Sequence, residues 1–348
     1  MSRDAMLLVQ ALRDPVSTQA LDAGGWTALI AMARAEQLIG TLEHRLSGEP
    51  LPSSVANIMS DASINAEYQR RAALWEGDCA QRALADFAGK VVLLKGTAYS
   101  AAGLVAGQGR HIGDLDIMVA RADLPQVEAM LLSKGGWEWV KEDAYDDAYY
   151  RDHMHELPPM IHKDRDRMID VHHTILPLTA GPRPDAGAML GAAIALLSTP
   201  KGVGLHILSP TDMVIHCATH LIADGDLAGG LRNLWDLHCL TTEFSESDDQ
   251  FWSSLQTRAT HHGLWQAVHT AARLAHALYG TEIPGSWRIR GNSDHFFIRR
   301  LTARDGWGRQ TRKFTRLIFY IRSHWLRMPP LMLAQHLFTK WRKAKDKT

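Results

Sequence analysis

Three short apolar runs near the middle of the chain restrict what this sequence can fold into. They are VVLL at 91–94, LDIMV at 115–119 and MIDVH at 168–172, and each is rich in β-branched residues. Runs of this length are typical of buried strands. A helical pattern follows Asp123, and strand-like alternation resumes at 137–140. Strands separated by helices predict a small sheet covered by helices. The tyrosine-rich stretch up to Arg151 suggests a loop or an exposed hairpin.

The flanks of this core have a different periodicity. Apolar residues repeat at helical spacing within 7–12, 26–38 and 53–88, and Ser209-Pro210 is a helix-start signal that opens a second helical region. For 348 residues, about two domains are expected. We therefore predict an α+β protein with an N-terminal helical segment (1–87), a small mixed-sheet core (88–178), a Pro- and Gly-containing connector (179–204) and a C-terminal helical domain (205–348).

The cysteine content bears on the compartment. Cys79, Cys217 and Cys239 are the three cysteines, and no CxxC spacing occurs. A disulfide framework and a cysteine zinc site are therefore disfavoured, and a reducing, cytoplasmic compartment is expected. The N-terminal apolar run is too short for a signal peptide, and no stretch of about eighteen uncharged apolar residues predicts a transmembrane helix.

A pair of carboxylates dominates the predicted core. Asp114 and Asp116 are two residues apart, which in a strand places both on one face about 7 Å apart. A third acid, Asp170, lies between two β-branched residues of a later strand. Clustered carboxylates repel one another unless a cation neutralises them, and oxygen ligands select Mg²⁺ or Mn²⁺. This donor set predicts metal-assisted phosphoryl or nucleotidyl transfer.

Neighbouring residues have the chemistry of phosphate binding. Lys95-Gly96-Thr97 ends a predicted strand, so its glycine allows close backbone approach and its threonine offers a hydroxyl. Arg110 precedes the acidic pair and could hold a triphosphate bidentately. His172 shares the face of Asp170 and could contact a phosphate, orient a metal ligand or be structural.

These motifs together resemble the polymerase-β-like nucleotidyltransferase superfamily. More closely, 92–96, Arg110 ahead of Asp114-Leu-Asp116, and Ile169-Asp170-Val171-His172 are similar to one poorly characterised bacterial nucleotidyltransferase family. The resemblance extends to Trp26–Leu38, to Leu208-Ser209-Pro210 and to His216, His220 and Asp236. It implies that the three aspartates bind metal and that Gly96-Thr97 holds nucleotide phosphates. The superfamily's usual Gly-Ser or Gly-Gly turn is here Lys95-Gly96-Thr97.

The expected reaction is Mg²⁺- or Mn²⁺-dependent transfer of a nucleoside monophosphate from an NTP to an acceptor hydroxyl, with release of pyrophosphate. Asp170, or a water that it holds, would help to deprotonate the acceptor. Neither the base of the NTP nor the acceptor can be read from the sequence. A small molecule, a saccharide, a peptide and RNA all remain open.

Two other classes of function remain open. His216, His220 and Asp224 follow each other at four-residue spacing and could form the metal site of a phosphohydrolase, or pack against Asp236 or the nucleotide. The chain could also be a non-catalytic interaction protein with the same fold. The presence of all three acids argues against that third hypothesis.

The end of the chain is strongly basic. Residues 309–348 contain eleven Lys and Arg and one acid, a formal charge of +10, whereas residues 1–308 contain 27 Lys and Arg and 37 acids, a charge of −10. An amphipathic pattern runs through this end, so it could lie on an anionic membrane, bind RNA or another polyanion, or pack on the second domain. The apolar positions of the pattern are Phe314, Leu317, Ile318, Ile321, Trp325, Leu331, Leu333, Leu337 and Trp341.

Overall fold

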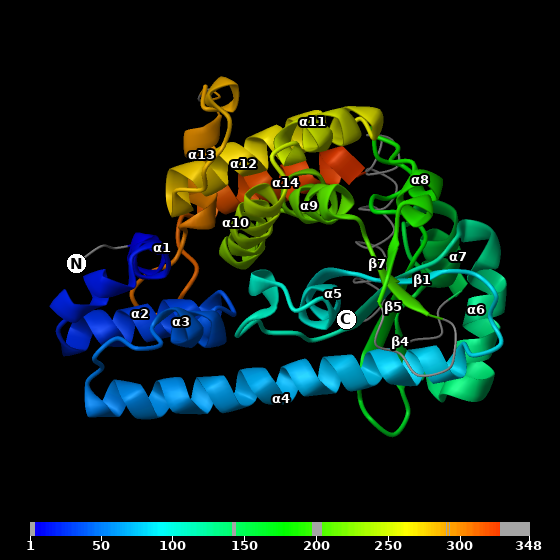
Figure 1. The fold of residues 1–348 in the computed structure, drawn as a ribbon, viewed down its shortest axis with the longest axis horizontal. Helices are drawn as coiled ribbons and strands as arrows, with labels where there is room; N and C mark the ends of the chain where they lie inside the picture. The colour runs from blue at the N-terminus through cyan, green and yellow to red at the C-terminus, as the bar shows by residue number, and fades with distance from the viewer. Residues whose placement is uncertain (1–3, 141–143, 197–203, 290, 292, 328–348) are drawn as a thin grey trace, which may run out of the picture.

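A computed structural model describes residues 4–140, 144–196, 204–289, 291 and 293–327. The end of the predicted basic pattern, from 328 onward, lies outside the described residues. Within the described chain, a mixed sheet occupies one side of the molecule, a long helix runs along its lower edge, and a layer of C-terminal helices covers the top (Figure 1).

The sheet has seven strands in the order β3-β4-β5-β2-β1-β7-β6. The runs predicted at 91–94, 115–119 and 168–172 form β1, β2 and β5, which lie together at its centre, and 137–140 forms β3. The strands are β1 (Val91–Leu93), β2 (Leu115–Met118), β3 (Trp137–Trp139), β4 (Met160–His162), β5 (Met168–His172), β6 (Ile194–Ala195) and β7 (Leu205–Ile207).

The central strands pair in both parallel and antiparallel directions. Strand β2 is parallel to β5 and antiparallel to β1, and β1 is parallel to β7. All residues of β1 and β2 are buried, as the unbroken apolar runs predict for strands that are covered on both faces. Strand β7 belongs to this sheet although its residues were expected at the start of the helical domain.

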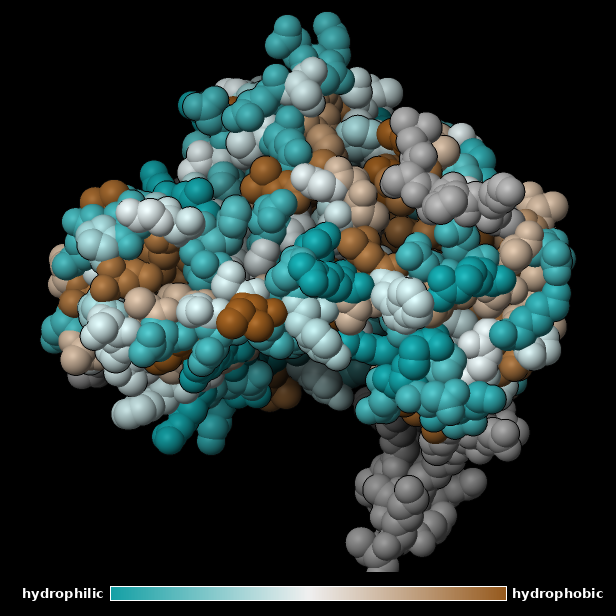
Figure 2. Space-filling model, turned by 60° about the horizontal axis from the view of Figure 1, so that its bottom comes forward, coloured by the Kyte–Doolittle hydropathy of each residue, from teal (hydrophilic) through white to brown (hydrophobic). Residues whose placement is uncertain are grey.

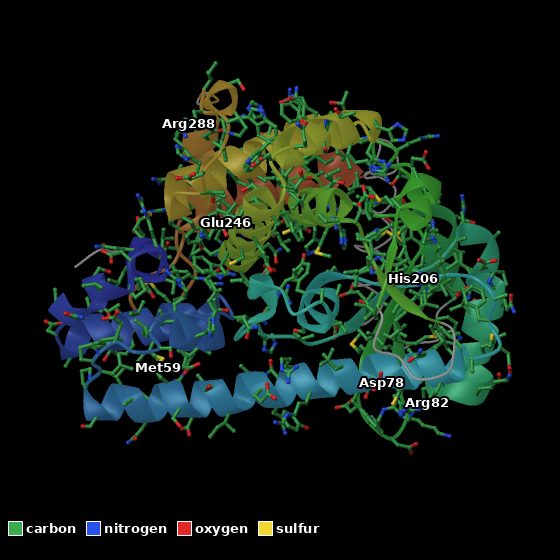
Figure 3. The ribbon with its side chains drawn as sticks, in the orientation of Figure 1. Met59, Asp78, Arg82, His206, Glu246 and Arg288 are labelled. Atoms are coloured by element: carbon green, nitrogen blue, oxygen red, sulfur yellow. The ribbon has the colours of Figure 1, made fainter. Side chains whose placement is uncertain are left out.

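The N-terminal segment is helical, as predicted. Its elements are α1 (Met6–Arg13), η1 (Pro15–Ala20), α2 (Ala23–Ala35), α3 (Ile39–Arg45) and α4 (Ser53–Ala83). Helix α4 extends along the whole lower edge, with Met59 near one end and Asp78 and Arg82 near the other (Figure 3). At the buried Gly77, α4 lies next to Leu93 and Leu205 of the sheet. The long helix thereby joins the N-terminal segment to the core.

The helices between the strands include one that the sequence reading missed. They are α5 (Lys95–Ala101), η2 (Val105–Gly107), η3 (Arg121–Asp123), α6 (Leu124–Met130), η4 (Leu131–Gly135), α7 (Ala144–His153) and α8 (Ala186–Gly191). The prediction of a loop or hairpin up to Arg151 is wrong, because those residues form α7. Arg151 pairs with Asp147 one turn earlier and with Glu128 on α6, so charge pairs stabilise a helix that lacks an apolar stripe.

The C-terminal region consists of helices. They are α9 (Pro210–Thr219), η5 (His220–Asp224), α10 (Gly230–Ser247), α11 (Phe251–His261), α12 (Trp265–Tyr279), η6 (Gly285–Trp287), α13 (Asp294–Leu301) and α14 (Lys313–Arg327). The predicted cap of α9 is confirmed, since the Ser209 hydroxyl accepts a hydrogen bond from the Asp212 amide at 3.3 Å. The α+β fold with helical flanks is confirmed as well.

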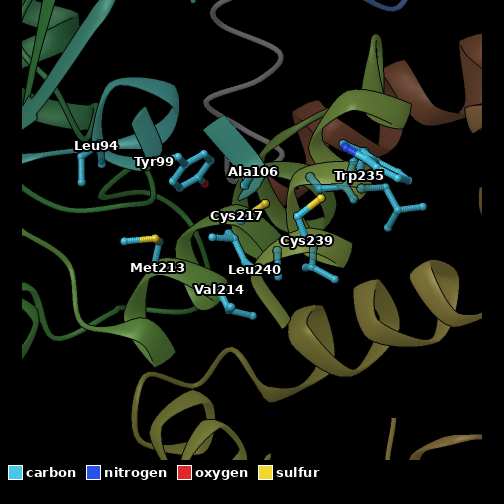
Figure 4. Close-up of a cluster of buried hydrophobic side chains, with 14 of the residues drawn as sticks. Leu94, Tyr99, Ala106, Met213, Val214, Cys217, Trp235, Cys239 and Leu240 are labelled. Atoms are coloured by element: carbon cyan, nitrogen blue, oxygen red, sulfur yellow. The ribbon is translucent and has the colours of Figure 1, made fainter. Parts of the chain in front are cut away.

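A shared core connects the sheet region to these helices. Tyr99 and Ala106, which follow β1, lie close to Cys217 of α9 and to Trp235 and Cys239 of α10 (Figure 4). All three cysteines are free thiols. The boundaries at 87, 178 and 204 stay a prediction, because the buried residues on both sides of them form one continuous cluster.

The surface in Figure 2 is mostly hydrophilic, with hydrophobic residues gathered in small groups. Among the described residues, no helix combines the length and the apolar character needed to cross a membrane.

Candidate active site

Two of the predicted acids lie side by side on adjacent parallel strands. Asp116 of β2 and Asp170 of β5 are register partners, so both side chains leave the same face of the sheet. Asp116 is buried and Asp170 is half-buried. The strand pairing therefore joins two carboxylates that are 54 residues apart in the sequence.

Asp114 lies just ahead of the same strand. It occupies a bend one residue before β2 and is exposed, whereas Asp116 is only 6% exposed. Both residues line one cavity. We expected Asp114 and Asp116 to lie on one face of a single strand, but a bend places Asp114 ahead of the strand. Both side chains still line the same cavity.

Two side chains hold Asp116 in place. The Lys95 ammonium lies 2.6 Å from Asp116 Oδ1, and His172 Nε2 lies 3.0 Å from the same oxygen. Lys95 begins α5 with a φ of +48°, in the left-handed region that side chains other than glycine seldom adopt. Burial lowers the pKa of His172, so its ring is neutral and donates its Nε2 proton to the carboxylate.

The three carboxylates titrate very differently. Burial raises the pKa of Asp116, but Lys95 and His172 outweigh burial and hold that pKa well below its usual range. Burial, followed by the charge of Asp116, raises the pKa of Asp170 to about 7. Partial burial and the same charge also raise the pKa of Asp114. One ammonium group therefore does not neutralise this group of acids. Oxygen donors with surplus negative charge are the ligands that a hard divalent cation prefers, but among the described residues these three acids do not form a group whose ligand atoms all lie within 4.8 Å of one another.

A second group of polar side chains borders the acids. Glu156 pairs with His172 through the backbone, and its Oε2 lies 3.5 Å from His172 Nε2 and 3.7 Å from His155 Nε2. In the described chain, His155, Glu156 and His172 form a group whose possible ligand atoms all lie within 4.8 Å of one another. From the sequence, the segment that contains His155 and Glu156 could border the site, but neither residue has an individual role there, because the bridge that brings them to β5 has no motif.

A cavity of about 430 Å³ opens beside the acids. It brings together eight of the predicted site residues, which are Lys95, Gly96, Arg110, Asp114, Asp116, His216, His220 and Asp236. Its other lining residues are Gln37, Tyr99, His111, Ile112, Gly113, Cys217, Arg232 and Asn233. Thr97, Asp170 and His172 are not part of its described lining. The N-terminal segment, the core and the C-terminal helices all contribute to the wall.

Arg110 is not free to reach a triphosphate. Its buried guanidinium forms an ion pair with Asp236 of α10, in which Nη2 and Nε lie 2.9 and 3.0 Å from Asp236 Oδ2 and Nε lies 3.2 Å from Oδ1. A Cβ added to Gly96 would lie 2.1 Å from Arg110 Nη1. The glycine of the predicted phosphate turn therefore makes room for the Arg110 side chain. Arg110 and Asp236, which were each expected to have a role at the site, form an ion pair with each other.

Thr97 lies away from the cavity. The residue is 1% exposed, and its Oγ1 is buried without a hydrogen-bond partner in the described structure. The structure therefore does not bring this hydroxyl to the place where a phosphate could bind.

His216 and His220 line the cavity, but they do not form the metal site that their spacing in the sequence suggested. Helix α9 ends at Thr219 and a π-helical turn begins at His220, so regular four-residue spacing stops there. Burial lowers the pKa of His216 well below its usual value, which leaves a neutral ring. Around this pair, the described residues contain no third ligand within 4.8 Å, and the side chain of Asp224 lies outside the description.

Arg232 is a site residue that sequence reasoning missed. It lies on α10 one turn before Asp236, donates a hydrogen bond to Gln37 Oε1, and has a buried Nε without a partner among the described residues. Burial and then the positive charge of Arg110 lower its pKa. The i, i+4 spacing of Arg232 and Asp236 was the available signal, but it is too common in surface helices to be informative.

The mixed sheet thus places a register pair of acids beside a cavity that is lined by both cationic and acidic side chains. Residues 22–280 match the family described as uncharacterised nucleotidyltransferase, and the chain belongs to that family. The resemblance noted in the sequence is confirmed, and family membership indicates nucleotidyl transfer as the general activity. No curated protein matches the chain.

Proposed function

We propose that this protein transfers a nucleoside monophosphate from an NTP to an acceptor hydroxyl in a reaction that needs Mg²⁺ or Mn²⁺. The observation that carries the proposal is the register pair Asp116–Asp170 with Asp114 beside it. These three acids would hold the metal, which supplies charge neutralisation at the phosphates and at the leaving oxygen. Three free cysteines are consistent with the proposed cytoplasmic location.

The chain's own groups can supply the remaining chemistry. The acceptor oxygen forms a bond to the α-phosphorus while the bond from that phosphorus to the bridging oxygen of pyrophosphate breaks. Asp170, or a water that it holds, would accept the acceptor's proton. Lys95 can exchange the Asp116 carboxylate for a phosphate oxygen once the acids are neutralised.

A direct test uses the purified protein, Mg²⁺ and each of the four NTPs labelled at the α-phosphate, with and without a cell extract. The proposal expects the label to move to an acceptor with release of pyrophosphate. The fraction that becomes labelled identifies RNA, peptide, saccharide or small molecule as the acceptor. Release of inorganic phosphate without transfer of label would instead support the phosphohydrolase alternative.

Metal binding is expected to depend on pH through Asp170. Its raised pKa means that the metal-free protein holds a proton that the metal must displace. Apparent Mg²⁺ affinity should therefore rise about tenfold per pH unit up to about 7 and then level off. The same raised pKa means that protonated Asp170 stabilises the metal-free fold most fully at pH values below 3.8, the ordinary pKa of this group. That stabilisation is lost as the pH rises to about 7.

Calorimetry of Mg²⁺ binding at pH 5.5–8.5, in buffers of different ionisation enthalpy, measures both the affinity and the proton released. The Asp170→Asn variant should bind more weakly and show a flatter pH profile. A wild-type affinity that is constant across this range would contradict the assignment of Asp170.

Arg232 is expected to hold the triphosphate in place of Arg110. Asp236 forms its ion pair with Arg110, whereas no carboxylate among the described residues forms an ion pair with Arg232, so the Arg232 guanidinium is the one available to a phosphate. Arg232→Gln should raise the Kd for NTP by about tenfold to a hundredfold, since a bidentate guanidinium–phosphate contact is lost.

Nucleotide affinity of Arg232→Gln, Arg232→Lys and wild type can be compared by equilibrium binding. Lysine should restore only part of the affinity, because it lacks the planar fork. Exposed Arg34 offers the control Arg34→Gln, which should bind as wild type does. Unchanged binding by Arg232→Gln would remove Arg232 from the nucleotide site.

A further inference from the structure

Helix α14 presents an apolar stripe to solvent on the side away from its packed face. Thr315, Phe319 and Ser323 are buried at four-residue spacing. The stripe follows the spacing i, i+3, i+4, i+7 and i+11, which covers an arc of about 100°. It consists of Phe314, Leu317, Ile318, Ile321 and Trp325, which are 75%, 52%, 47%, 54% and 62% exposed.

The concentration of apolar surface on this helix is unusual for the chain. Of the seventeen exposed large hydrophobic residues among those described, six lie on α14, including Tyr320. Single exposed apolar residues need no explanation, whereas a continuous stripe marks an interaction surface.

Basic residues flank the stripe on both sides. On a helical wheel, Lys313, Arg316 and Arg327 lie on one side and Arg322 lies on the other. The helix contains no acid, and the charge of residues 309–348 is +10 against −10 for the rest of the chain. An apolar stripe with Lys and Arg on either side is the pattern of a helix that lies in the plane of an anionic membrane surface.

A groove next to the stripe has the same character. Helices α13 and α14 enclose a cavity of about 700 Å³ with phenylalanine and isoleucine walls. Its basic lining residues are Arg299, Arg312, Lys313 and Arg322. Apolar walls with a cationic rim suit an amphiphile whose head is negatively charged.

Arg322 supports this assignment. Its guanidinium lies over the rings of Phe297 and Phe319, at 5.1 and 5.9 Å, and one nitrogen donates to the Ile222 carbonyl oxygen at 2.8 Å. Within the described chain it has no carboxylate partner, and its Nη1 is buried without a hydrogen bond. A partly buried cation that lacks a counter-ion favours an anion in the adjoining groove.

We propose that α14 docks this protein on a membrane surface that contains anionic phospholipid. The stripe would enter the boundary between headgroups and acyl chains, and the flanking Lys and Arg would contact lipid phosphates. RNA would use the charge but gain little from the aliphatic residues Leu317, Ile318 and Ile321. A second copy placed stripe to stripe would bring two basic helices of like charge together. The inference does not depend on the proposed transfer reaction.

Vesicle flotation tests the docking without NTP or Mg²⁺. The full chain should float with phosphatidylcholine vesicles that contain about 30% phosphatidylglycerol, remain unbound with pure phosphatidylcholine, and dissociate as salt is raised. Phe314→Ser with Ile321→Ser should lower the vesicle partition coefficient at least about tenfold. Both residues point to solvent, so the fold should be unaffected, which circular dichroism can verify.

A matched control uses the exposed apolar pair of α4. Ile64 and Tyr68 are 67% and 65% exposed, and Ile64→Ser with Tyr68→Ser should float as wild type does. The proposal is overturned if wild type binds no anionic vesicles or if both double variants bind equally. Absence of flotation together with stripe-dependent dimers in light scattering would point to a second copy. Absence of flotation with RNA binding by both wild type and the stripe variant would point to RNA.

Discussion

Replacing Asp114 and Asp116 together by asparagine is expected to abolish metal-dependent nucleotidyl transfer while the protein stays folded. The two side chains line the cavity, and Asp116 is the partner of Asp170 across the sheet. Loss of metal-assisted charge neutralisation costs several kcal/mol in the transition state, so the rate should fall at least about 10³-fold. Asparagine keeps the size of the side chain and a hydrogen-bond acceptor for Lys95 and His172.

The measurement is transfer of α-labelled phosphate at saturating Mg²⁺, with circular dichroism to confirm folding. Asp61 is an exposed acid on α4, so Asp61→Asn serves as the control and should retain full activity. If the double variant transferred label at the wild-type rate, these acids would not be the metal ligands and the proposed function would fail.

Asp236→Asn should destabilise the fold more than Arg110→Gln does. Asp236 attracts both Arg110 and Arg232, so its loss leaves one buried and one half-buried guanidinium group that repel each other. Breaking a buried ion pair from one side costs about 3–5 kcal/mol of unfolding free energy. Loss of Arg110 costs less, because Arg232 remains near Asp236 as a counter-charge.

Urea unfolding followed by circular dichroism gives the free energies for comparison. A surface ion pair supplies the control, since Lys134 and Asp86 are both largely exposed, and Asp86→Asn should leave the midpoint unchanged. Equal costs for the two buried variants, or a larger cost for Arg110→Gln, would show that Arg232 does not share Asp236.

The sequence predicts those parts of the fold that depend only on the pattern of neighbouring residues in the chain. Apolar β-branched runs identify the central strands, and helical periodicity identifies the flanks. The register between β2 and β5 cannot be read from either strand alone, but it makes partners of Asp116 and Asp170. The short strand β4 and the edge strand β6 have too few residues for a period-two pattern, so the sequence does not predict them.

The site is predicted less completely because its polar contacts span the chain. Residue type indicated a role for Arg110 and the family resemblance one for Asp236, but their partnership over 126 positions needed the fold. The Gly96 turn suggested phosphate binding, whereas the structure fills the space above that glycine with a guanidinium. Arg232 and Gln37 come from helical flanks, where charged and amide residues are usually only solvated.

The contact between Lys95 and Asp116 has a consequence for how the ligands should bind. At rest, the ammonium group satisfies the most deeply buried of the three proposed metal ligands, so the apoprotein should remain folded after treatment with a chelator. Once that acid has another cation, Lys95 becomes available to an incoming polyphosphate. Metal and nucleotide binding would then be cooperative, each raising the affinity for the other by the same factor. A single lysine would in this way restrict assembly of the reactive complex to occasions when both ligands are present.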